Sequence, residues 1–137
     1  MSVRNVVRRV RAAVTRPAAP PAISYSPVLD GDPDPGEVVW TWVPYEDDPR
    51  QGKDRPVIVI GREGDRLLAL QLTSKGNGRS DCFELGRGEW DSQDRISYVK
   101  LDRLLRIDPH EMRREGAIID RKRFDRVVRS LQEHHTR

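Results

Sequence analysis

Residues 55–74, RPVIVIGREGDRLLALQLTS, contain two apolar runs joined by a short, charged segment with two glycines. The first run alternates valine and isoleucine, which favour the extended backbone of a strand. A connection as short as residues 62–65 suits two antiparallel strands that are neighbours in the sheet. The stretch therefore predicts an antiparallel hairpin.

Further strand-forming segments lie on both sides of this hairpin. Residues 36–45, GEVVWTWVPY, are rich in β-branched and aromatic residues and predict a strand that ends at Pro44. Residues 81–88, DCFELGRG, predict another short strand. No alternation of strands with helices appears, so nothing indicates a parallel sheet.

Residues 96–108, ISYVKLDRLLRID, predict one or two more strands, with Ile96, Tyr98 and Leu101 on an inward face. A helix is the alternative for this segment, because three of its leucines also fit a 3.6-residue period.

The last segment of the chain predicts a helix over residues 121–134. Asp120 is a suitable N-cap, because its carboxylate can accept a hydrogen bond from the first helical turn. One apolar stripe follows the helical period: Phe124, Val127, Val128 and Leu131. Together the segments predict a mainly β (α+β) chain, a small antiparallel barrel with a C-terminal helix.

Length and charge suggest one domain with an extension. A chain of 137 residues is sufficient for one modest core. Residues 1–34 form a basic arm and a linker rich in proline and alanine, and residues 35–137 form the barrel domain. Residues 1–30 hold five arginines and one aspartate, a charge of +4, so the rest of the chain carries −1 of the total +3. Residues 1–14 are interpreted as a disordered arm or as a short amphipathic helix.

Several classes of function find no support in the sequence. No stretch approaches the roughly 20 apolar residues of a membrane-spanning helix, and no secretory signal is visible, so a cytoplasmic protein is expected. The single cysteine, Cys82, has no internal disulfide partner. Three histidines without metal-ligand spacing indicate no metal site, and no cofactor is expected. Residues 76–78, GNG, lack the lysine and hydroxyl residue of a phosphate-binding loop.

Cationic and hydroxyl side chains gather at one end of the predicted hairpin. Arg55 opens its first strand, and Thr73, Ser74 and Lys75 close its second. In an antiparallel pair, the start of one strand lies beside the end of the next. Guanidinium and hydroxyl groups at a common edge form a good site for a phosphate. Surface residues without a function are the alternative interpretation.

The order of these segments resembles the MazF/PemK family of toxin endoribonucleases. The resemblance covers residues 36–133 and depends on GEVVW, RQGKDRPVIVI, LTSKG, FEL, SYVKLDRLLRID and GAIID in that order. It implies an SH3-like barrel and a homodimer that acts as the toxin of a type II toxin–antitoxin system and is neutralised by a cognate antitoxin. It also implies metal-independent, sequence-selective cleavage of single-stranded RNA, leaving a 2′,3′-cyclic phosphate and a 5′-hydroxyl.

The resemblance assigns roles to individual residues. The family's essential arginine before Pro-Val falls on Arg55, and its threonine at the end of the next long strand falls on Thr73. These are the expected catalytic residues. Other side chains of the same edge are expected to bind RNA: Arg50, Lys53, Ser74, Lys75 and Arg79. Trp40 and Trp42 are interpreted as core or dimer contacts, with base stacking as the alternative.

One position departs from the family pattern. Many members have Glu-Gln in the loop before the arginine, whereas this chain has Arg50-Gln51. The proton acceptor is therefore unassigned, and Asp47, Asp48 and Asp54 are candidates. Two other functions stay open: an inactive SH3-like module that binds RNA or protein, and an inhibitor of a topoisomerase, as in the related CcdB toxins.

Overall fold

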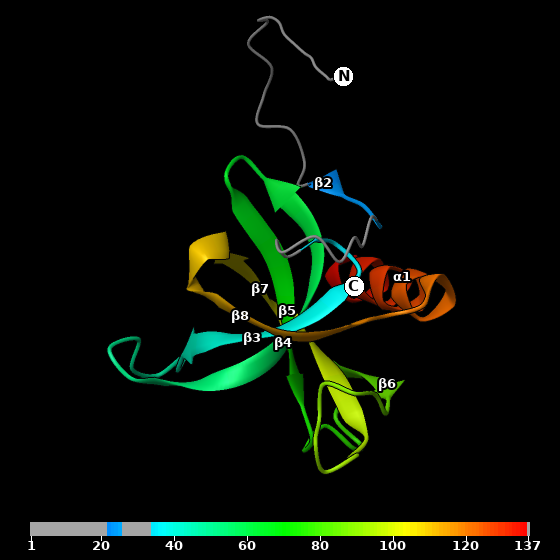
Figure 1. Ribbon diagram of the computed structural model, residues 1–137. Coiled ribbons are helices and arrows are strands. Elements are labelled where there is room, and N and C mark those ends of the chain that lie inside the picture. The colour runs from blue at the N-terminus through cyan, green and yellow to red at the C-terminus, as the bar shows by residue number, and fades with distance from the viewer. Residues whose placement is uncertain (1–21, 26–33, 137) are drawn as a thin grey trace, which may run out of the picture.

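The computed structural model describes residues 22–25 and 34–136, which form a curved antiparallel sheet and one long helix (Figure 1). The elements in chain order are β2 (Ala22–Ile23), β3 (Glu37–Pro44), β4 (Gly52–Glu63), β5 (Arg66–Thr73), β6 (Cys82–Gly86), β7 (Ser97–Ile107), the 3-10 helix η1 (Pro109–Glu111), β8 (Met112–Ile118) and α1 (Arg121–His135). The predicted fold class, a mainly β antiparallel barrel with a C-terminal helix, is confirmed. The amphipathic helix considered for residues 1–14 lies outside the described residues.

The strands follow the order β6-β7-β5-β4-β3-β8, and β2 adds to β4 outside this path. Every pairing is antiparallel. The predicted hairpin over residues 55–74 corresponds to β4 and β5, with Ile58 opposite Leu70. Because β8 returns to pair with β3, the sheet curves into a half-open barrel (Figure 1).

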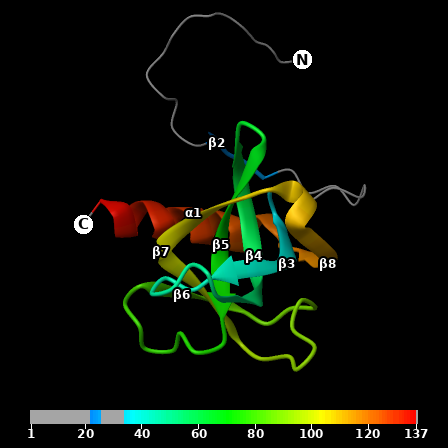
Figure 2. The same ribbon diagram turned by 90° about the vertical axis from the view of Figure 1, so that its left-hand side faces the viewer.

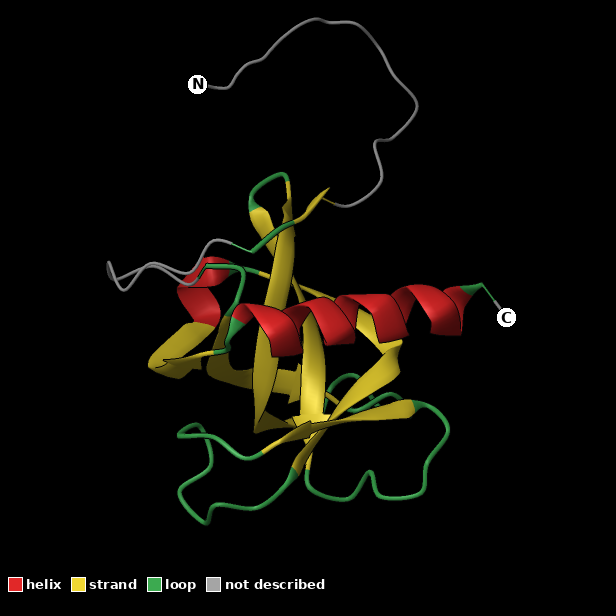
Figure 3. Ribbon diagram, turned by 90° about the vertical axis from the view of Figure 1, so that its right-hand side faces the viewer, coloured by secondary structure: helices red, strands yellow, loops and turns green. Residues whose placement is uncertain are grey.

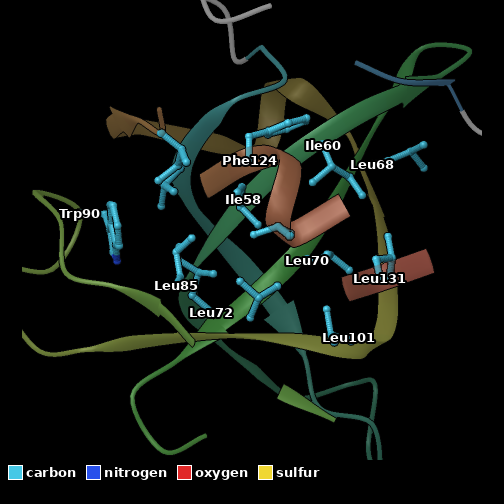
Figure 4. Close-up of a cluster of buried hydrophobic side chains, with 14 residues drawn as sticks. Ile58, Ile60, Leu68, Leu70, Leu72, Leu85, Trp90, Leu101, Phe124 and Leu131 are labelled. Atoms are coloured by element: carbon cyan, nitrogen blue, oxygen red, sulfur yellow. The ribbon is translucent and has the colours of Figure 1, made fainter. Parts of the chain in front are cut away.

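Both faces of the central strands are buried, which explains the uninterrupted apolar run in β4. Val57 and Val59 belong to one buried cluster, while Ile58 and Ile60 belong to a second. Neighbouring residues of a strand point to opposite faces, so a strand that is covered on both sides needs apolar residues at every position. Helix α1 crosses one face of the sheet (Figure 3), and the second cluster lies between the two (Figure 4).

Residues 97–107 form the single strand β7, so the helical alternative is wrong. The predicted inward face is also wrong for Ile96 and Tyr98, which are only half-buried, whereas Ser97, Val99 and Leu101 are buried. The reason is that Ser97 takes an inward position and accepts a hydrogen bond from a buried tryptophan. A serine inside the core conceals the alternation of apolar and polar residues in the sequence.

A segment that the sequence places in the linker contacts the barrel. Ala22 and Ile23 pair with Arg62 and Gly61 of β4. The Tyr25 hydroxyl donates a hydrogen bond to the carbonyl of Ile119 at 2.7 Å. The Tyr25 ring also packs edge-on against a phenylalanine of α1, with the ring centroids 5.1 Å apart. Residues 22–25 thus tie β4 to the start of the helix.

Helix α1 begins after Asp120, as predicted, and its apolar stripe faces the sheet. Phe124, Val127 and Leu131 are buried, and Val128 is half-buried against the same cluster. The Asp120 carboxylate accepts hydrogen bonds from the Arg123 backbone N–H at 3.1 Å and from its Nε at 2.7 Å. Within the described ranges, no helix is long and apolar enough to cross a membrane.

We expect Asp120→Ala to lower the free energy of unfolding by about 1 kcal/mol, because the first turn of α1 loses its cap. Hydrogen bonds from Arg123 hold the pKa of Asp120 below its usual value. The cap therefore stabilises the fold fully above the unfolded pKa of about 3.9, and this contribution is lost as pH falls through the lower folded pKa. Urea denaturation at neutral and acidic pH measures both effects.

The matched control is Asp125→Ala, which removes only the exposed ion pair with Arg121 on the same helix. We expect that variant to lose about 0.3–0.5 kcal/mol. Equal losses for the two variants would contradict a capping role for Asp120.

Candidate active site

A cleft of about 510 Å³ opens at the end of the barrel where β4 begins and β5 ends. The loops that follow β5 and β6 leave the sheet at this end, as Figure 2 shows. The lining residues are Trp40, Lys53, Asp54, Arg55, Pro56, Gln71, Leu72, Thr73, Ser74, Lys75, Arg79, Asp91, Arg95, Ser97 and Lys100. The edge predicted from the hairpin is therefore one wall of a larger cavity.

Arg55 and Thr73 both line this cleft and are half-buried. The ladder between β4 and β5 ends at the pair Val57 and Gln71; Arg55 lies two residues before that pair and Thr73 two residues after it. The strand register thus brings the two residues to the same end of the hairpin. Each side chain keeps part of its surface open to solvent, as contact with a substrate requires.

A compact turn after β5 carries the other hydroxyl and basic residues. The Thr73 Oγ1 accepts a hydrogen bond from the Lys75 backbone N–H at 3.1 Å, and the Gly76 carbonyl accepts one from the Arg79 N–H at 3.1 Å. A Cβ on Gly76 would lie 2.5 Å from the Cβ of Tyr98, so the turn approaches β7 too closely for any side chain. This contact holds the turn, with Lys75 and Arg79, at the cleft.

An irregular stretch of β7 adds a further cation to the cleft. On β5, Leu70 pairs with Leu104 and Leu72 with Val99, so residues 100–103 of β7 have no partner on β5. Such irregularities redirect side chains and are common beside active sites. Lys100 belongs to this stretch and lines the cleft.

The residues that line the cleft include six basic and two acidic side chains, so the cleft is cationic although the domain is nearly neutral. Three of the cations form ion pairs: Arg79 with Asp81, Arg95 with Asp91, and Lys100 with Glu46. The other three, Lys53, Arg55 and Lys75, have no carboxylate partner among the described residues. These three can offer a full positive charge to a ligand.

The paired aspartates stay ionised at neutral pH. The hydrogen bond from Arg79 lowers the pKa of Asp81. Burial raises the pKa of Asp91, but hydrogen bonds from Arg95 and from the Gln93 backbone outweigh burial, so the pKa of Asp91 lies below its usual value. Near neutral pH, both carboxylates are thus charged in the folded protein and neutralise the arginines they pair with.

Arg50 does not line the cleft. It lies in the loop between β3 and β4, where its Nε donates to the Asp48 carboxylate at 3.1 Å, and its side chain is 90% exposed. Of the three aspartates that the sequence offers as proton acceptors, Asp54 alone lines the cleft. Within the described residues, no group of His, Cys, Asp and Glu side chains could hold a metal ion.

Other residues of the cleft carried no recognisable signal in the sequence. Asp91 and Arg95 belong to a polar loop that the sequence alone gives no reason to place beside Arg55. Trp40 lines the cleft, and its Nε1 donates to the Trp90 carbonyl at 3.1 Å, whereas Trp42 is 49% exposed. The two tryptophans thus have different surroundings, although both belong to β3.

The family described as PemK-like, MazF-like toxin of type II toxin–antitoxin system matches residues 34–135. This chain belongs to that family. Among solved structures, this PemK/MazF chain is similar to one in the crystal structure of MazE–MazF (Form-II) from Deinococcus radiodurans, with a TM-score of 0.57. The two are 21% identical, and the match covers 78% of this chain and 98% of the other.

At that identity the structural likeness supports the fold of this PemK/MazF toxin and nothing finer. The sequence has no significant match among curated proteins. The family match begins at residue 34, so the family assignment rests on the barrel domain and α1.

Proposed function

We propose that this PemK/MazF toxin is a metal-independent endoribonuclease that cleaves single-stranded RNA by attack of the substrate's own 2′-hydroxyl. One observation supports this proposal above the others: Arg55 and Thr73, from adjacent strands, line a solvent-open cleft in which three cations have no carboxylate partner among the described residues. RNA carries one negative charge per phosphate, so unpaired cations at the cleft favour its binding.

Arg55 is the proposed stabiliser of the charge that builds on the phosphate oxygens. Its guanidinium provides a planar set of N–H donors and no acceptor, so it is suited to stabilise charge and not to act as the base. In a partly desolvated cleft, donors that are already in place stabilise a pentacoordinate phosphorane more than they stabilise the ground state.

Thr73 is the proposed second donor. Its oxygen already accepts a hydrogen bond from the Lys75 N–H, which fixes the position of the hydroxyl and leaves its proton free to donate. A hydroxyl at the end of β5 can thus orient a phosphate oxygen without adding charge.

The proposed proton acceptor is Asp54, which precedes Arg55 on β4 and lines the cleft. In the proposed step, the 2′-hydroxyl proton passes to this carboxylate while the 2′-oxygen bonds to phosphorus. The bond from phosphorus to the 5′-oxygen then breaks, and the leaving oxygen takes a proton from water. The products carry a 2′,3′-cyclic phosphate and a 5′-hydroxyl. The other acidic residue of the cleft, Asp91, is less suitable because its side chain is only 9% exposed, whereas Asp54 is exposed to solvent.

The proposal extends to partners. The similar solved structure from Deinococcus radiodurans is a MazE–MazF complex, and we propose a cognate antitoxin for this chain as well. A cationic cleft suits an acidic, extended antitoxin segment that folds on binding. We further propose that the toxin acts as a homodimer.

We expect the purified full-length protein to cleave a long single-stranded RNA in the presence of a chelator and to leave cyclic phosphate ends. Sequencing of the 5′ ends gives the positions of cleavage. A test of whether the 3′ ends require phosphatase treatment before ligation shows whether they carry a phosphate. Binding to RNA without cleavage would favour the inactive-module alternative. Ends that carry a 5′-phosphate would contradict attack by the 2′-hydroxyl.

A further inference from the structure

The cations of the cleft differ in whether a carboxylate neutralises them. Lys53 and Arg55 on β4 and Lys75 after β5 have no carboxylate partner among the described residues. Arg95 is neutralised by Asp91 on the loop between β6 and β7. A net charge attracts phosphates wherever they lie, whereas a neutralised arginine contributes directed hydrogen bonds and little long-range attraction.

The geometry of the Arg95–Asp91 pair leaves one side of the guanidinium available. Nε donates to Asp91 Oδ2 at 2.9 Å and Nη2 donates to Oδ1 at 3.4 Å. This contact uses the lateral edge of the guanidinium, so the terminal edge keeps one N–H on each Nη, parallel to one another. The Asp91 side chain is only 9% exposed, while the Arg95 side chain is 51% exposed. The nearly buried aspartate therefore fixes the orientation of the Arg95 guanidinium, and the terminal edge of that guanidinium can contact a ligand.

The loop that carries this pair is fixed to the barrel through Trp90. The Trp90 ring is buried, and its Nε1 donates to the Ser97 hydroxyl at 2.9 Å. The Trp90 carbonyl accepts a hydrogen bond from the Trp40 Nε1, and the Arg123 guanidinium of α1 lies over the ring at 5.7 Å. A Cβ on Gly88 would lie 1.8 Å from the same ring, so the loop packs tightly around it.

Arg123 also holds the beginning of the loop. Its Nη1 donates to the carbonyls of Leu85 and Arg87 at 3.4 and 3.0 Å, and its Nε donates to Asp120. The loop is thus attached to β3, β7 and α1. A donor pair on a fixed loop loses little conformational entropy when a ligand binds, which is the condition for selective recognition.

We propose that Arg95 is a specificity-determining residue that recognises a guanine base of the RNA through the O6 and N7 atoms. This inference rests on the proposed RNA-binding function of the same cleft. Two parallel N–H donors match the two adjacent acceptors on that edge of guanine. Adenine and uracil present no such pair, and cytosine presents one only on its Watson–Crick edge, at O2 and N3. In single-stranded RNA this edge is free to be bound.

The test compares single-stranded RNAs bound by the full-length protein, with 2′-O-methyl groups throughout so that no cleavage occurs. We expect wild-type protein to bind a guanine-containing oligonucleotide at least about tenfold more tightly than the same oligonucleotide with adenine or 7-deazaguanine in its place. Arg95→Ala and Arg95→Lys should both lose this difference, because neither retains the two parallel donors. Fluorescence anisotropy measures the dissociation constants.

Arg87→Ala is the matched control, because Arg87 lies in the same loop, pairs with Asp94 and does not line the cleft. It should keep the guanine preference. A preference that survives in Arg95→Ala, or that is lost in Arg79→Ala instead, would overturn the inference. So would wild-type protein that binds RNA with no preference for guanine.

The binding readout separates this inference from the proposed reaction. Wild-type protein that binds guanine through Arg95 but does not cleave unmodified RNA would overturn the nuclease proposal and support the present one. Wild-type protein that cleaves RNA with equal frequency at sites with and without guanine would support the nuclease proposal and overturn the role of Arg95 in recognising guanine. Protein that binds no RNA would overturn both.

Discussion

Arg55→Ala is expected to slow RNA cleavage by about 100- to 1,000-fold, the effect of removing one preorganised donor from a developing oxyanion. Arg55 lines the cleft, is half-buried and has no carboxylate partner among the described residues. Its removal therefore leaves no buried charge unpaired, and the fold should persist. The loss should fall mainly on the rate of the chemical step, because the phosphate, already an anion in the bound RNA, gains further negative charge as the phosphorane forms.

Single-turnover cleavage of a short RNA by excess protein measures that step directly. Arg66→Ala is the matched control. Arg66 is the first residue of β5 and Thr73 is the last, so Arg66 lies far from the cleft, and its side chain is half exposed. It should cleave at the wild-type rate. Arg55→Lys separates charge from geometry: a lysine retains the charge but lacks the planar fork, so only partial recovery is expected. An Arg55→Ala protein that is folded and cleaves at the wild-type rate would exclude Arg55 from the reaction.

The part of the site that could be predicted is the part that depends on local pairing. The hairpin formed by β4 and β5 follows from two apolar runs and a short connection, and its antiparallel register places Arg55 and Thr73 at one end. No information from distant segments is needed for that step. The N-cap of α1 and its buried stripe are local features of the same kind.

The rest of the site depends on contacts between segments that are far apart in the sequence. Arg95 lies in the cleft because Trp90 is held by Ser97, Trp40 and Arg123, and none of these contacts has a periodic signature. Similarly, β8 pairs with β3 although its sequence, MRREGAI, lacks alternation of apolar and polar residues. A strand of this composition forms because a partner edge is available, which the sequence does not reveal.

Arg50 is a residue that the sequence places at the site and the structure does not. The sequence places it close to Lys53 and Arg55, and nearness in the chain suggested nearness in the site. The structure instead turns the loop back through a hydrogen bond from the Gln51 N–H to the Asp48 carbonyl and pairs Arg50 with Asp48. A short polar loop can reverse direction within a few residues, so charge spacing along it does not define a common surface.

Leu70→Ala is expected to lower the free energy of unfolding by about 2–5 kcal/mol, from lost apolar burial and from the cavity that remains. Leu70 is fully buried, lies opposite Ile58 on one neighbouring strand and Leu104 on the other, and belongs to the cluster between the sheet and α1 (Figure 4). Backbone pairing on both sides leaves the strands little freedom to close the cavity, which places the cost toward the upper end of this range.

Against a total stability of about 5–15 kcal/mol for a domain, this loss is a large fraction. Urea denaturation followed by circular dichroism measures it, and an unchanged slope would show that the change lies in stability and not in the denatured state. Ile118→Ala, at a position 41% exposed on β8, is the control and should lose less than about 1 kcal/mol. Because α1 packs on the Leu70 cluster and Arg123 of α1 holds the loop of Arg95, the Leu70 variant should also lose RNA selectivity at urea concentrations that leave wild-type protein selective. Equal stability of the two variants would contradict a role for the Leu70 cluster in supporting both the barrel and the cleft.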